Sequence, residues 1–159
     1  MNFFRTISIA VIAAFAFNNA TAADIKLPDY QSVTLDNGAT LLLMPRKDVP
    51  LIAASIPVRG GALADPAGKE GTADLLGDML SKGAGSRSAL QFAQTVDGSG
   101  GTIGFGSSRE AITANAQFLS RDSDLMLSLL ADALLRPKLD AAEFDKLRKR
   151  AIDGIANAK

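Results

Sequence analysis

The chain has 159 residues, equal numbers of acidic and basic side chains, and no histidine, cysteine or tryptophan. This length fits one domain of ordinary size, and an apolar content of 47% is enough for a hydrophobic core. The balanced charge argues against a nucleic acid partner. The lack of histidine and cysteine removes the usual general base near neutral pH and the commonest zinc ligands.

Residues 1–22 have the pattern of a secretory signal peptide. A single positive charge at Arg5 precedes an apolar run over residues 6–17, and Ala20-Thr21-Ala22 forms an A-x-A cleavage site. The apolar run is shorter than the roughly 20 residues that a bilayer-spanning helix needs, so no stable membrane anchor is expected. We therefore expect cleavage between Ala22 and Ala23 and export, most simply to a bacterial periplasm.

The remaining residues, 23–159, open with strand patterns. A hairpin is predicted over residues 32–45, with Asn37-Gly38 at a turn whose two central positions both have φ > 0. A strand follows over residues 51–58, and then a loop rich in glycine and proline. Apolar residues at helical spacing next predict a helix over residues 70–82, ended by Gly83-Ala84-Gly85.

The second half predicts two further helices around a pair of strands. A helix over 88–96, capped by Ser86 or Ser88, is followed by a glycine-rich break and by strands over 102–105 and 111–118. A helix over 122–135 and a last helix capped by Asp140 complete the chain. The apolar face of this last helix carries Phe144, Leu147, Ala151 and Ile155. The predicted strands and helices follow one another in runs and do not alternate strictly. This order favours an α+β fold with a mostly antiparallel sheet packed with helices.

The segment over residues 71–83 reads Gly-Thr-Ala-Asp-Leu-Leu-Gly-Asp-Met-Leu-Ser-Lys-Gly. It resembles the zinc-binding helix of the insulinase (pitrilysin) family, which carries an inverted His-x-x-Glu-His motif. Further segments that look like the family's lie in the same order along residues 28–155: Leu35-Asp36-Asn37-Gly38, Val58-Arg59-Gly60-Gly61-Ala62, Gly98-Ser99-Gly100-Gly101 and Arg136-Pro137. The resemblance implies an insulinase-like N-terminal peptidase domain over residues 23–159. We expect it to be incomplete at its C-terminus, because the last helix reaches Lys159 without a stop signal.

The family's functional positions fall on residues without the family's chemistry. The two histidine ligands fall on Asp74 and Asp78, and the glutamate that acts as general base falls on Gly77. The third ligand, a glutamate on a later helix, falls on Gly154, and a supporting glutamate falls on Leu147. Zinc serves the active members, but the resemblance implies neither a catalytic residue nor a zinc cofactor for this chain.

Asp74 and Asp78 keep the i, i+4 spacing that places two side chains on one helix face. Three interpretations stay open: a solvated pair of carboxylates, a weak site for Ca²⁺ or Mg²⁺, and a retained zinc site. The other candidate motifs give weaker evidence for a function. The serines have no histidine to activate them, the glycines at 98–101 do not match a phosphate-binding loop, and Arg148-Lys149-Arg150 is either a solvated helix face or a partner contact.

Three functions are compatible with these residues. The first is a non-catalytic structural or peptide-binding subunit that pairs with an active insulinase-like zinc peptidase. Its peptide would add a strand at the edge formed by residues 101–106, although this segment is equally consistent with an ordinary hairpin strand. The second is a metallopeptidase with an atypical metal site. The third is a truncated remnant without activity.

Overall fold

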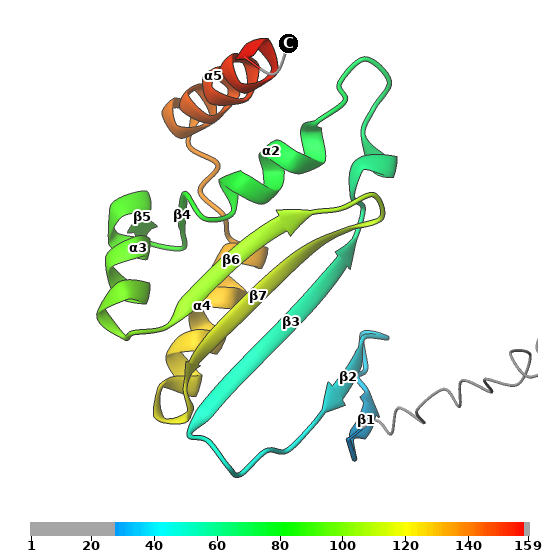
Figure 1. Cartoon of the computed structure of the whole chain (residues 1–159), viewed down its shortest axis with the longest axis vertical. Coiled ribbons are helices and arrows are strands. Elements are labelled where there is room, and N and C mark those ends of the chain that lie inside the picture. The colour runs from blue at the N-terminus through cyan, green and yellow to red at the C-terminus, as the bar shows by residue number, and fades with distance from the viewer. Residues whose placement is uncertain (1–27, 158–159) are drawn as a thin grey trace, which may run out of the picture. The chain divides into compact units, whose positions relative to one another are not determined.

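Antiparallel strand pairing organises the chain in a computed structural model that describes residues 28–157 (Figure 1). The predicted signal peptide, residues 1–22, lies outside the described residues. The chain divides into two compact units between Arg46 and Lys47, and each is described by itself. Along residues 28–157, no helix combines the length and the apolarity needed to cross a membrane.

The first unit contains the predicted hairpin. Strands β1 (Gln31–Thr34) and β2 (Thr40–Leu43) pair antiparallel, with Thr34 opposite Thr40. The expected turn is wrong in one respect, because Gly38 has a positive φ of 81° and Asn37 does not. Leu35 and Ala39 are still paired by a hydrogen bond, so the loop has three residues, and such a loop needs a left-handed conformation only at its last position.

The second unit is built on a sheet of three strands: β3 (Leu51–Arg59), β6 (Thr102–Ser107) and β7 (Ala111–Leu119). Their order is β3-β7-β6, and both pairings are antiparallel (Figure 1). The register places Ile56, Ala114 and Phe105 side by side across the sheet. The α+β fold with an antiparallel sheet is therefore confirmed.

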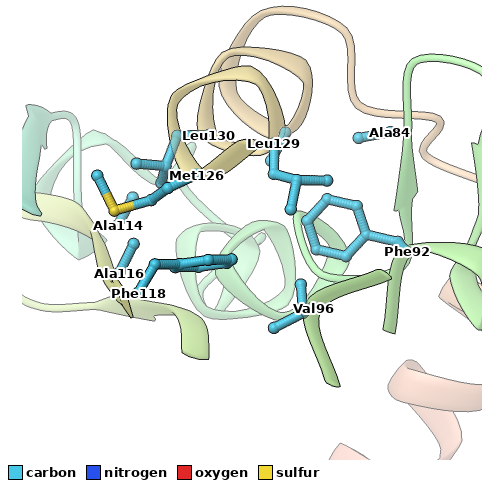
Figure 2. Packing of buried hydrophobic residues seen from close by; sticks show 10 residues of the cluster. Ala84, Phe92, Val96, Ala114, Ala116, Phe118, Met126, Leu129 and Leu130 are labelled. Atoms are coloured by element: carbon cyan, nitrogen blue, oxygen red, sulfur yellow. The ribbon is translucent and has the colours of Figure 1, made fainter. Parts of the chain in front are cut away.

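Helix α4 (Ser123–Leu135) contacts β7 and supplies much of the core. Its residues Met126 and Leu129 are 1% and 0% exposed, and they point toward Phe118 of β7 and Phe92 (Figure 2). Phe92 comes from α3 (Ala89–Gly98). Gly101 is needed where β6 begins, because a Cβ there would lie 2.6 Å from the Phe118 ring.

Local capping signals set the starts of two helices. Ser88, rather than Ser86, caps α3: its Oγ accepts from the Gln91 N–H at 3.3 Å, and the Gln91 side chain accepts from the Ser88 N–H at 2.9 Å. Asp140 caps α5 (Ala141–Asn157) by accepting from the N–H groups of Ala142 and Glu143. Both caps lie within three residues of their donors, which is why the sequence could indicate them.

A short hairpin, β4 (Gly83–Ala84) and β5 (Arg87–Ser88), was not predicted. It is joined to α4 by Asp132, which is 5% exposed and accepts hydrogen bonds from the guanidinium groups of Arg87 and Arg136. The Arg87 Nη1 lies 3.0 Å from Asp132 Oδ2. Two short 3₁₀ helices, η1 (Ala62–Ala64) and η2 (Ser120–Asp122), complete the elements.

Candidate functional site

The helix that carries the candidate site is α2 (Thr72–Met79), shorter than the predicted range of 70–82. Its start is set by Asp65, whose carboxylate accepts from the N–H groups of Gly71 at 2.7 Å and Ala73 at 2.8 Å. No short-range signal in the sequence indicates this cap, because Asp65 lies six to eight residues before its donors and reaches them across the loop over residues 66–70. Gly83 and Ala84, which were expected only to end the helix, form β4.

Helix α2 contacts β6 through its buried face (Figure 1). Gly77 lies on this face, and a Cβ at Gly77 would lie 3.5 Å from the Ser107 nitrogen and 3.6 Å from the Gly106 carbonyl carbon. These are ordinary contact distances, so the position has room for a side chain that would start beside the end of β6. Asp74 and Asp78 are exposed.

The candidate third position lies on α5, which packs against α2 (Figure 1). Gly154 is exposed, and a Cβ there would have no atom within 4 Å. Leu147, at the position of the supporting glutamate, is 6% exposed. The rest of the apolar face of α5 is not covered by the described residues, since Phe144 and Ala151 are exposed and Ile155 is 68% exposed.

The basic run on α5 forms local contacts. Arg148 pairs with Asp145 at 3.1 Å and lies over the ring of Phe144, and Lys149 pairs with Asp153 at 2.8 Å. Pairs three or four residues apart on an exposed helix contribute only about 0.2–0.5 kcal/mol each. These contacts agree with a solvated face.

The residues at the candidate site do not fit zinc. Asp74 and Asp78 offer only carboxylate oxygens, Gly77 and Gly154 offer no side-chain donor, and residues 28–157 contain no group of three potential metal ligands. A catalytic zinc site needs three protein ligands and an open position for water. No metal-dependent step can therefore be derived from these side chains.

One titrating group lies just before α2. The pKa of Glu70 is lowered, because the backbone N–H groups of Glu70 and Gly68 donate to its carboxylate. A lowered pKa keeps this carboxylate ionised near neutral pH, so Glu70 is not a source of protons for acid catalysis. Its hydrogen bonds instead hold the loop that leads into the helix.

Curated relatives match most of this chain. An uncharacterized zinc protease of Rickettsia bellii is 27% identical over 125 residues, covering 79% of this chain and 30% of the relative. The mitochondrial-processing peptidase subunit beta of Lentinula edodes is 26% identical over 115 residues, covering 72% of this chain and 25% of the relative. The chain thus spans less than a third of the length of either relative.

Two solved structures share the fold. A peptidase M16 inactive domain from Pseudomonas fluorescens superposes with a TM-score of 0.74 at 22% identity, covering 79% of this chain and 31% of that one. A protease from Helicobacter pylori gives a TM-score of 0.71 at 24% identity, covering 80% and 31%. The family model described as insulinase, peptidase family M16, matches residues 44–159. This chain therefore belongs to the insulinase family of peptidases, family M16.

Proposed function

We propose that this chain is a non-catalytic, peptide-binding member of the insulinase family that acts beside an active zinc peptidase. The observation that carries the proposal is that α2 is held against the sheet as a functional helix should be, but lacks the side chains that bind zinc and activate water. The helix is capped by Asp65 and contacts β6, as a helix that presents groups to the sheet edge should. The base position, however, is Gly77, and two of the ligand positions are Asp74 and Asp78.

The relatives support a role in a larger assembly. One is named as a subunit of a processing peptidase, and one solved neighbour is described as an inactive domain. A partner would supply the zinc chemistry that α2 lacks, and a chamber of the relatives' size would need more than residues 28–157, since this chain spans less than a third of these proteins.

The proposal includes export, because residues 1–22 have the signal peptide pattern. The mature protein is expected to begin at Ala23. N-terminal sequencing of the protein from its native cells checks this, and a soluble cytoplasmic product that retains Met1 would contradict it.

The peptide would bind at the free edge of β6. Ser108 donates to the Ala111 carbonyl at 2.8 Å, and in an antiparallel pair every second residue repeats this bonding. The alternate residues of β6, including Ile103 and Phe105, therefore direct their N–H and C=O groups to the free edge, where an extended peptide can add as a strand.

The opposite edge of the sheet, along β3, is a poorer template. Gly60 donates to the Glu110 carbonyl at 3.0 Å, so the even-numbered residues of β3 bond to β7. Pro57 then lies at a position whose N–H would face the free edge, and proline has none to offer. This difference between the edges favours β6 as the site of strand addition.

Co-expression with an insulinase-type peptidase that carries an intact His-x-x-Glu-His motif tests the proposal. The chain is expected to co-purify with the peptidase and to raise its zinc-dependent hydrolysis of an extended peptide, while cleaving nothing alone. Two peptides that are N-methylated at opposite sets of alternate residues should differ in affinity. One should bind more weakly than the unmodified peptide and the other equally well, since only one set of N–H groups meets the edge. Stoichiometric zinc in the chain alone, with chelator-sensitive turnover, would instead establish an atypical metallopeptidase.

A further inference from the structure

The face of the three-stranded sheet that points away from the core carries small, polar side chains. The register aligns Ala53, Gln117 and Thr102 in one row across the strands, and Ser55, Asn115 and Gly104 in the next. All six residues are exposed in the part of the chain that the structure describes. Together they line most of a shallow hollow of about 610 Å³.

Four side chains in this hollow have unused hydrogen-bonding groups. Among residues 28–157, the side chains of Ser55, Thr102, Asn115 and Gln117 make no intramolecular hydrogen bond. An amide side chain offers two donors and a carbonyl acceptor, and a hydroxyl offers both roles. The neighbouring Ala53 and Gly104 are small, so they leave these groups accessible from above the sheet.

The hollow also contains no charge. Arg59 is the one charged residue in β3, β6 and β7, and it lies at the end of β3, outside the hollow. Edge strands such as β3 and β6 ordinarily carry charged residues, which discourage pairing with other chains. A charged group pressed against this surface would lose hydration without gaining an opposite charge, whereas an uncharged polar group would exchange water for the amides and hydroxyls.

We infer that this open face is a second contact surface for the bound peptide and that it selects an uncharged polar segment, rich in Ser, Thr, Asn, Gln and Gly. The inference rests on the proposed peptide-binding function. It adds a preference that the edge of β6 cannot provide, because main-chain pairing at an edge is largely indifferent to side-chain charge.

Peptide binding to the full chain, followed by fluorescence anisotropy, tests this preference. The probes are labelled peptides of equal length, in which a Ser/Asn/Gln segment is replaced by one containing Lys or Glu. The wild-type chain should bind the neutral peptide best. The isosteric variant Asn115→Asp/Gln117→Glu should favour the Lys peptide over the neutral one by about threefold to tenfold at low salt, the range of two exposed ion pairs, and lose this gain at high salt.

Gln94→Glu on α3 is a matched control, because Gln94 is also exposed but lies outside the hollow. This variant should bind the peptides with the same order of affinities as the wild-type chain. If binding responds to N-methylation but Asn115→Asp/Gln117→Glu behaves like Gln94→Glu, the inference is overturned and the edge-binding function stands. If no peptide binds, both fail. If the double variant instead dissociates a dimer in sedimentation, the face pairs with a second copy and the inference is also overturned.

Discussion

Grafting the family's zinc chemistry onto this chain is expected to require four substitutions rather than three. Asp74→His, Asp78→His and Gly77→Glu rebuild the motif on α2, but they supply only two protein ligands, and two ligands make a poor catalytic zinc site. Adding Gly154→Glu should tighten zinc binding more than about 100-fold, because even residues that only support a ligand contribute 10- to 100-fold.

The structure gives both new glutamates room. A Cβ at position 77 meets the end of β6 at 3.5 Å, and a Cβ at position 154 meets nothing within 4 Å. Replacing the helical Gly154 also removes a residue that costs about 0.8–1.0 kcal/mol relative to alanine, so the change should not unfold α5.

Competitive titration against a zinc chelator measures the affinity of the triple and quadruple variants. Gly154→Gln in the triple background is the matched control, since it has the same length and no carboxylate. Equal affinities of the triple and quadruple variants would show that residue 154 does not correspond to the third ligand.

Removing both arginines that contact Asp132 is expected to destabilise the chain by about 3 kcal/mol. The Asp132 side chain is 7% exposed and pairs with Arg87 and Arg136. Arg87→Met/Arg136→Met keeps the aliphatic stems but leaves a buried carboxylate without a positive partner. Urea denaturation of the two proteins measures the difference in the free energy of unfolding.

Asp132→Ala tests whether the unpaired carboxylate causes this loss of stability. Alone, it should cost about 1–2 kcal/mol, because the two arginines are more exposed and can return to water. In the Arg87→Met/Arg136→Met background it should restore stability, since it removes the stranded charge. If the triple variant is less stable than the double variant, the carboxylate is not the source of the loss.

Local signals along the sequence determined two of the helix starts and the order of the elements other than β4, β5 and the two 3₁₀ helices. The capping bonds of Ser88 and Asp140 reach residues two or three positions away, so the required donors and acceptors are visible in the sequence. The same applies to the β6–β7 hairpin and to α2, where the helical spacing of Ala73, Leu76 and Leu80 predicts the helix that carries the candidate site.

Only the tertiary structure decided how these elements meet. It brought Asp65 to the first turn of α2, set Gly77 against Ser107, and joined Asp132 to Arg87, 45 positions away. It also made β3 and β6 the edges of the sheet and placed unpaired polar groups in rows on its open face. A capping or turn signal operates over three or four residues, whereas these contacts depend on how whole helices and strands pack, and no local pattern in the sequence specifies that packing.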